Sequence, residues 1–443
     1  MNKDKKQIGF WGAAAIGIGG MVGGGIFAVL GLSVQLAHGG APIAFALGGI
    51  VALLTAYSYS RLSVTFPSQG GTVTFLDRAF GPTIPVGAMN ILLWLSYIVM
   101  LSLYASAFGS YGAAFASQSS HVLVKHILIV AGVVLISGLN LMSAEVIGKA
   151  ETWIVGIKIT ILLFFIAVGI SQVQVAQISP SAWAPPVQII AGGMIIFLAY
   201  EGFELIANTA DDVKNPHRLL PRAFMFSVLF VIFLYILIAA VATGTLSVDK
   251  IVAAQDYALA VAAEPTLGKA GFILIACAAL LSTSSAMNAT FYGAARLSYI
   301  IAKEGELPEV LEKKVWNRPA EGLLITAAAT LLVANLFDVS SISTMGSAGF
   351  LLIFAAVNAA NLKLRKDTGS NLLVPISGVV SCLGALLVLL WQTYRTKPAE
   401  LFTLAIMLGL SWLVEWLYRR FKRGALRFVH KPARKPPEPE AQS

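Results

Sequence analysis

The chain has 443 residues, of which 57% are hydrophobic and only 12% are charged, and its formal net charge is +9. Soluble globular proteins carry about 25% charged residues, and a folded domain of a few hundred residues still exposes about a quarter of the surface of its unfolded chain. A mean hydropathy of +0.79 therefore excludes an ordinary soluble enzyme, a disordered chain and a secreted disulfide scaffold. The composition predicts an all-α integral membrane protein.

Runs of about 20 apolar residues, the length that crosses the hydrocarbon core of a bilayer, recur along the chain. Short polar or Gly/Pro segments separate them and leave little room for a soluble domain. They predict twelve transmembrane helices, at about 8–35, 40–66, 84–117, 122–141, 146–170, 186–210, 222–246, 269–302, 320–337, 340–362, 374–394 and 399–421.

The basic residues lie mostly on one side of these spans. Of the 31 Lys and Arg residues, 24 fall on the side of the two termini and five on the opposite side, while Lys158 and Arg296 fall inside spans. Because cytoplasmic loops are rich in Lys and Arg, both termini are expected in the cytoplasm, with the spans in the cell membrane. Residues 1–7 form a short N-terminal segment, and the basic tail 422–443 is expected to lie against anionic lipid rather than nucleic acid.

The first span is interrupted by glycine. Six of the nine positions from 17 to 25 are Gly, and each costs about 1 kcal/mol relative to Ala inside a helix. Close helix packing through small residues is the alternative, but it does not require three consecutive glycines. We therefore expect an unwound segment, which a membrane helix tolerates only where it lines a cavity.

A lysine stands near the centre of the fifth span. Lys158 is too deep to reach the membrane surface easily. Loss of water disfavours its charged form, which makes it a candidate proton-coupling residue. The alternative is a lysine paired permanently with carbonyl groups or a carboxylate.

The sixth span carries two acids, Glu201 and Glu204, around Gly202. A charge at the bilayer centre costs roughly 2.5–3.5 kcal/mol or more, so such acids face a cavity or a partner. Interrupted first and sixth helices predict an inverted repeat of five plus five spans, here 8–170 and 186–362, followed by two helices in 374–421. Half-helix N-termini then offer N–H groups to a ligand carboxylate.

The eighth span contains four consecutive hydroxyl residues. Some of them must face the protein interior, where they bond either their own backbone or the lysine or a ligand. Arg296, further along, is expected to anchor the span. No metal-binding spacing, nucleotide motif or hydrolase motif is present, so no metal, cofactor or enzymatic activity is expected. The four hydroxyl residues are Ser282, Thr283, Ser284 and Ser285.

Together these motifs resemble those of the amino acid–polyamine–organocation superfamily of permeases, in order from residue 12 to about 320. The resemblance implies a LeuT-like fold and secondary active transport of amino acids. The similar segments are Gly23–Phe27 (the break in helix one), Phe66–Gly71 and Arg78–Gly81 (the following loop), Tyr200–Glu204, Ala210–Pro216 and Leu220–Arg222 (the helix-six signature) and Ala302–Pro308 (the loop after helix eight).

Within this superfamily, Lys158 aligns with the helix-five lysine of the sodium-independent, proton-coupled, ApcT-like permeases. The resemblance implies that its ammonium replaces a sodium ion and bridges carbonyls near Gly19 or Gly20 to hydroxyls among 282–285. It also implies that N–H groups of Gly24 and Gly25 bind a substrate carboxylate, and that carbonyls of helix six bind its amine. The implied substrate site comprises Gly23, Gly24, Gly25, Ile26, Tyr200, Glu201, Gly202 and Phe203.

Glu201 is a carboxylate where many relatives have an apolar residue. It selects cationic substrates, takes part in proton transfer, or hydrogen-bonds the unwound segment; Glu204 matches an acid of the family. The third span adds the pocket or relay candidates Trp94, Ser96, Tyr97 and Tyr104. The expected function is proton–amino acid symport; the alternative is exchange of amino acids or polyamines, with Lys158 as a fixed cation.

Overall fold

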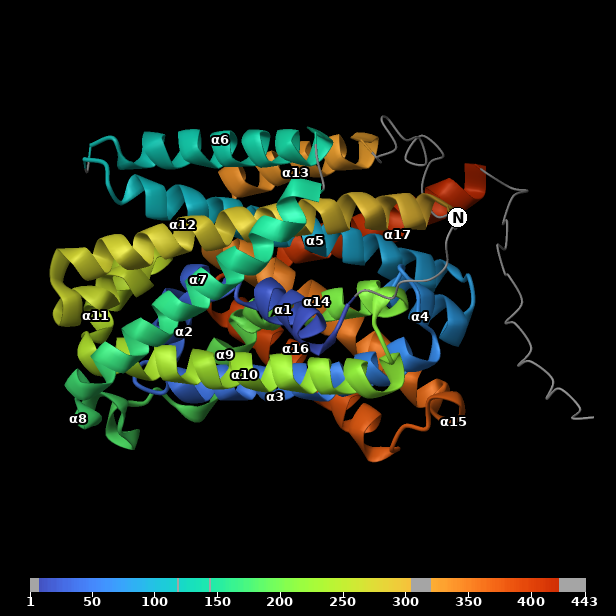
Figure 1. The fold of residues 1–443 in the computed structure, drawn as a ribbon, viewed down its shortest axis with the longest axis horizontal. Helices are drawn as coiled ribbons and strands as arrows, with labels where there is room; N and C mark the ends of the chain where they lie inside the picture. Colours follow the sequence, from blue (N-terminus) through green and yellow to red (C-terminus); the bar gives the residue numbers. More distant parts are fainter. Residues whose placement is uncertain (1–7, 118, 143–144, 304–319, 422–443) are drawn as a thin grey trace, which may run out of the picture.

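A computed structural model describes residues 8–117, 119–142, 145–303 and 320–421. The N-terminal segment 1–7, the basic tail 422–443 and most of the loop motif after the eighth span lie outside the described residues. The long elements of the described part are all helices (Figure 1). They are α1 (Phe10–Met21), α2 (Gly25–Ala37), α3 (Ala41–Thr65), α5 (Ile84–Ala113), α6 (His121–Met142), α7 (Glu145–Gly169), α9 (Pro186–Ile195), η4 (Phe203–Asp212), α10 (Pro216–Thr245), α12 (Ala258–Lys303), α13 (Ala320–Leu336), α14 (Val339–Lys363), α16 (Leu373–Thr396) and α17 (Pro398–Phe421).

Shorter helices connect the long ones. They are α4 (Thr72–Phe80), η1 (Ile170–Gln172), α8 (Val175–Ile178), η2 (Pro180–Ala182), η3 (Phe197–Tyr200), α11 (Val248–Ala254), η5 (Gln255–Tyr257) and α15 (Arg365–Thr368).

The helices account for the expected membrane spans. Among the described residues, nine helices are long and apolar enough to cross a bilayer, and two bent pairs of helices would each make one further span. The pairs are α1 with α2, bent by 47°, and α9 with the 3₁₀ segment 197–212, bent by 51°. The remaining expected span corresponds to α13, whose apolar part is shorter.

Two boundaries differ from the sequence-based expectation. The seventh span, α10, begins at Pro216 rather than near 222 and contains Pro221. The eighth, α12, begins at Ala258 and continues across a kink at Gly268, where φ is +60°. Proline is well accepted in the first turn of a helix, which explains the earlier start at Pro216.

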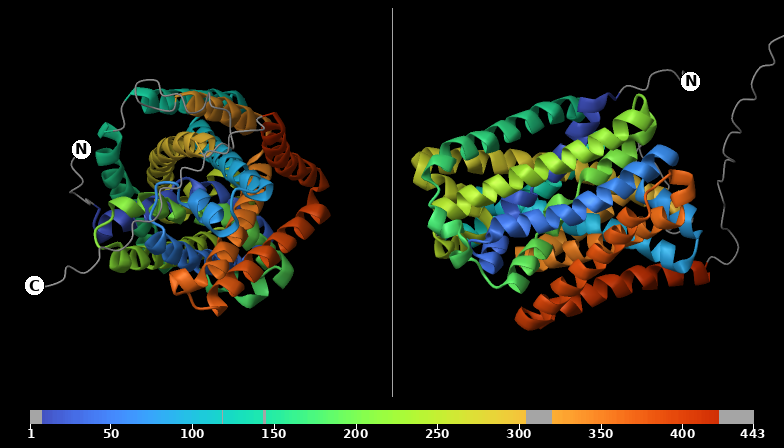
Figure 2. Two further views of the ribbon diagram at one scale, coloured as in Figure 1. Left: turned by 90° about the vertical axis from the view of Figure 1, so that its right-hand side faces the viewer. Right: turned by 90° about the horizontal axis from the view of Figure 1, so that it is seen from below.

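The two broken helices lie at the centre of the bundle (Figures 1 and 2). The α5 helix packs beside them and is buried along most of its length. By contrast, α6, α16 and α17 lie at the periphery (Figure 2) and expose large apolar side chains, including Leu135, Leu387 and Phe402. This arrangement suits a protein surrounded by lipid, where the outer helix faces are apolar and irregular backbone is confined to the interior.

A charged cluster positions the start of α14, a helix that contacts the break in the sixth span. Lys397 lies 3.1 Å from Asp338 and 3.2 Å from Glu400. Glu400 in turn accepts hydrogen bonds from Ser341 and Thr344, each at 3.0 Å. The cluster ties α14 to the connection between α16 and α17.

The stability of this cluster is expected to depend on pH. Burial raises the pKa of Asp338, but hydrogen bonds from Ser341 and Lys397 outweigh it and hold the pKa below its usual value. Its contribution is therefore complete above the ordinary pKa of about 4 and is lost as the pH falls further. For Lys397, burial lowers the pKa, but the bonds and charges of Asp338 and Glu400 outweigh it, so its contribution is lost only at strongly alkaline pH.

Asp338→Asn is expected to lower the melting temperature of the detergent-solubilised protein slightly at pH 7. Because the Asp338 and Lys397 side chains are 60% and 46% exposed, the effect should stay below about 1 kcal/mol. The difference from wild type should close as the pH is lowered below about 4. A difference in melting temperature that does not change with pH would show that the charge of Asp338 plays no part.

Candidate functional site

The breaks in the first and sixth spans cross at two glycines. Gly202 has φ +114°, a conformation that strongly favours glycine. A Cβ on Gly202 would overlap the carbonyl carbon of Gly20 and lie 2.6 Å from the nitrogen of Met21. A Cβ on Gly20 would lie 2.8 Å from the carbonyl oxygen of Gly202. The two chains are therefore in direct backbone contact, which only glycine at both positions allows.

The glycine triplet between α1 and α2 is packed on three sides. A Cβ on Gly25 would lie 2.7 Å from the Cα of Ala199 in η3, and one on Gly23 would lie 2.8 Å from Ala286 of α12. A Cβ on Gly24 would overlap the ring of Tyr104 from α5. Three consecutive glycines are thus explained by close approach from three different elements.

Side chains from three helices bind the carbonyl groups released by the first break. The last carbonyls of a helix have no intrahelical donor, and in a membrane interior they must find another partner. Lys158 Nζ of α7 donates to Gly19 O at 3.0 Å, and Tyr235 Oη of α10 donates to Met21 O at 2.6 Å. Ser282 Oγ of α12 contacts Val22 O, at 2.9 Å, and Gly23 O.

Lys158 is buried beside the first break and binds the carbonyl oxygen of Gly19. Its side chain is 0% exposed, and its bond to Gly19 holds the end of α1 against α7. Of the hydroxyl residues, Ser282 binds the same unwound segment, whereas Thr283 donates to Ala279 O of its own helix. Ser285 is buried and Ser284 is half-buried.

Tyr235 connects the two breaks and was not singled out by the sequence. Besides Met21 O, its hydroxyl lies 3.3 Å from Ala199 O of η3. A tyrosine in an apolar span carries no distinctive signal, because aromatic residues are common there. The structure identifies it through the two carbonyl oxygens that it approaches.

Tyr235→Phe is expected to destabilise the protein by about 1–3 kcal/mol, because Met21 O then stays buried without its donor. Tyr200→Phe is the matched control. Tyr200 Oη donates to Phe45 O at 2.7 Å, but Phe45 lies inside the continuous helix α3, whose carbonyls already have backbone donors. Thermal unfolding in detergent should show the larger loss for Tyr235→Phe, and equal losses would contradict this assignment.

One of the two acids of the sixth span, Glu204, binds its unwound backbone. Glu204 Oε2 accepts from Gly202 N at 2.7 Å, and Glu204 Oε1 accepts from Tyr97 Oη at 3.3 Å. Glu201 and Glu204 are both buried. The Glu204 carboxyl group thus takes up one of the N–H groups that the break in the sixth span releases.

Helix α14 supports the same break through two serines that the sequence analysis also missed. Ser343 Oγ and Ser347 Oγ donate to Ile195 O at 2.5 and 2.9 Å, and Leu198 N donates to Ser347 Oγ at 3.0 Å. The freed backbone groups of α9 and η3 thereby gain partners.

The candidate residues of the third span contact different parts of the molecule. Tyr97 and Tyr104 reach the breaks, as described above. The indole of Trp94 instead donates to Thr326 of α13 at 3.1 Å, and Ser96 packs against Gly349 of α14. Trp94 and Ser96 thus contact α13 and α14, and their part in a pocket or relay stays a prediction.

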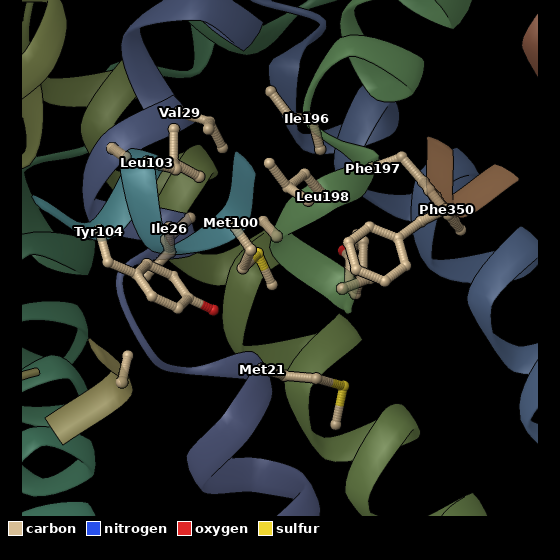
Figure 3. Packing of buried hydrophobic residues seen from close by; sticks show 14 of the residues in the cluster. Met21, Ile26, Val29, Met100, Leu103, Tyr104, Ile196, Phe197, Leu198 and Phe350 are labelled. Carbon is tan, nitrogen blue, oxygen red and sulfur yellow. The ribbon is translucent and has the colours of Figure 1, made fainter. Parts of the chain in front are cut away.

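Apolar side chains fill the space beside the breaks. Figure 3 shows residues of α2, α5, η3 and α14 pointing toward one another, all of them buried. They include Ile26, Met100, Leu198 and Phe350, with Tyr104 beside them. The four elements therefore meet through a packed apolar cluster on this side of the breaks.

A cavity lies on the other side of the breaks, toward the end of the molecule where α1 begins. Its volume is about 1030 Å³, and its walls come from α1, α5, η4, α12 and the loop before α4. It reaches Gly20 and Tyr97 at the breaks. Trp11 and Tyr292 line it and are 72% and 52% exposed, so its mouth is at the surface. We call this cavity the vestibule.

Comparison with known proteins identifies the family to which this chain belongs. The family model described as amino acid permease matches residues 8–411, which is nearly the whole chain. The chain belongs to the amino acid permease family. This permease is therefore a multi-pass membrane transporter rather than an enzyme.

Similar proteins cover the permease almost end to end. An uncharacterized protein of Methanocaldococcus jannaschii is 36% identical over 422 residues, which cover 95% of this chain and 97% of that protein. The inner membrane transport protein YbaT of Escherichia coli is 34% identical over 425 residues, covering 95% of this chain and 98% of YbaT. The methylthioribose transporter of Bacillus subtilis is 25% identical over 430 residues, covering 91% of each chain.

Proposed function

We propose that this permease moves an amino acid across the cell membrane together with a proton, by alternating access. The observation that carries the proposal is Lys158, a fully buried ammonium group bonded to the carbonyl oxygen of Gly19 at the first break. Because no water surrounds it, the free energy of this buried charge depends on its hydrogen-bond partners. Gain or loss of its proton is therefore coupled to the position of α1.

The cargo binds at the two breaks. The first N–H groups of α2 and η4 have no intrahelical acceptor, and helix N-termini attract anions. We assign the cargo carboxylate to N–H groups of Gly24 and Gly25, and its amine to the carbonyls of Tyr200 and Glu201. The site comprises Gly23, Gly24, Gly25, Ile26, Tyr200, Glu201, Gly202 and Phe203.

The orientation follows from the basic residues. With both termini in the cytoplasm, the vestibule faces the cytoplasm, and this conformation is the one that releases or accepts cargo there. Residues 8–170 and 186–362 form the two inverted repeats, and 374–421 packs outside them.

The test is uptake into proteoliposomes without sodium. Vesicles with an alkaline interior receive a panel of labelled amino acids, together with methylthioribose, because one relative is named for that compound. Proton-driven symport predicts accumulation of an amino acid that a protonophore abolishes. Uptake that ignores the pH gradient and requires amino acid on both sides would instead establish exchange.

A further inference from the structure

The vestibule contains one charged side chain. Among the described residues that line it, only Arg296 of α12 is charged, and no carboxylate accompanies it. The other polar residues of the described lining are neutral and include Gln69, Asn208 and Thr209. Within the described part of the chain, the vestibule therefore carries a positive charge without an opposing one in its walls.

Arg296 differs from other arginines at this end of the molecule. Its side chain is half-buried, yet it makes no hydrogen bond or ion pair with any described residue. By contrast, Arg419 pairs with Glu415 and donates to Pro82 O at 2.9 Å, and Arg61 lies over the ring of Tyr57. A guanidinium group has five donors in a planar fork that suits a carboxylate. Among the described residues, no acceptor binds the guanidinium donors of Arg296, and no carboxylate lines the cavity that they face.

The position of Arg296 separates it from the breaks. Ser282, on the same helix, contacts the first break, and Arg296 lies fourteen residues further along α12, about 21 Å along the helix axis. No arginine side chain spans that distance. Beside it, a Cβ on Gly293 would meet nothing within 4 Å, so space is open for a small group.

We propose that Arg296 forms a second, transient binding site for the carboxylate of the cargo, inside the vestibule and distinct from the site at the breaks. This proposal rests on the proposed function, since it takes an amino acid as the cargo. It also narrows the cargo class. A positive charge that no carboxylate of the described lining opposes attracts carboxylates and repels cations. It therefore favours neutral or acidic amino acids over cationic amino acids and polyamines as cargo.

The experiment compares the KM for cargo that enters from the outer face of the membrane with the KM for cargo that enters from the cytoplasmic face. Uptake by intact cells gives KM on the outer face, and uptake by inverted membrane vesicles gives KM on the cytoplasmic face. Arg296→Gln is expected to raise the cytoplasmic KM roughly tenfold, the size expected when a charge-assisted hydrogen bond is lost, and to leave the outer KM unchanged. Arg296→Lys should restore part of the affinity.

The matched control is Arg218→Gln, which removes the same charge from an exposed position at the start of α10. It should change neither KM. An unchanged cytoplasmic KM in a transporting Arg296→Gln variant would overturn the proposal, and so would an equal rise in Arg218→Gln, because the effect would then be one of surface charge. A wild-type protein that carries no amino acid from either face would contradict the proposed function itself.

The expected preference for neutral over cationic amino acids is tested in the same inverted vesicles. Wild-type protein should take up neutral amino acids from the cytoplasmic face in preference to arginine, and Arg296→Gln should reduce that preference. Equal wild-type uptake of arginine and neutral amino acids would overturn this part of the proposal.

Discussion

Lys158→Met is expected to lower proton-driven accumulation of cargo at least about tenfold, the effect of losing one charged hydrogen bond in the interior. Methionine has a similar length but neither a proton to exchange nor a donor for Gly19 O, which Lys158 contacts at 3.0 Å. The cargo site itself is left intact, because its proposed ligands are backbone groups at the breaks. Uptake in sodium-free proteoliposomes measures the loss of accumulation, and equilibrium binding of the same cargo should show that its affinity is unchanged.

Two further variants test whether the effect is specific to Lys158 and to the release of its proton. Lys250→Met removes a lysine that is exposed in α11 and should leave transport unchanged. Lys158→Arg keeps a charge that is not released in proteins, so it should retain cargo binding and lose proton-driven accumulation. If Lys158→Met accumulates cargo in response to the pH gradient as well as wild type, Lys158 is a structural cation and the transporter uses another proton site.

Gly202→Ala is expected to cause a large loss of both stability and transport. Its φ of +114° is strained for alanine, at about 1–3 kcal/mol, and its Cβ would overlap the backbone of Gly20. Because the contact is with backbone, no side-chain rotation can relieve it. We expect a lower melting temperature in detergent and transport close to background.

Gly268→Ala is the matched control for the backbone strain. Gly268 also has a positive φ, +60°, but a Cβ there would meet nothing within 4 Å. It should lose less stability than Gly202→Ala and keep most of its transport. Equal losses in the two variants would mean that backbone strain, and not the crossing of the two breaks, accounts for the effect.

The breaks were predictable because their signals are local. Six glycines in nine positions, and two acids beside Gly202, contradict a regular membrane helix within a single short stretch. Lys158 was found for the same reason, since one charge in an apolar span needs no knowledge of its neighbours. The positions of most spans followed from hydropathy alone.

The partners of the breaks were not predictable in the same way. Tyr235, Ser343 and Ser347 are ordinary residues of membrane helices, and small hydroxyl residues commonly mediate helix packing there. Ser347 acquires its role only because tertiary packing brings it to Ile195 O, 152 positions away in sequence. Helix rotation likewise decides that Trp94 faces α13, and that Arg296 lines the vestibule.

The contact between Gly20 and Gly202 also bears on the speed of transport. A gate made of side chains opens by rotamer changes within picoseconds to nanoseconds, whereas collective movement of helices takes microseconds to milliseconds. At the inner end of the vestibule, which Gly20 lines, Gly20 and Gly202 meet main chain against main chain. Under the proposed function, cargo that moves between the breaks and the vestibule waits for a helix segment to move, and this movement sets an upper limit on the turnover rate.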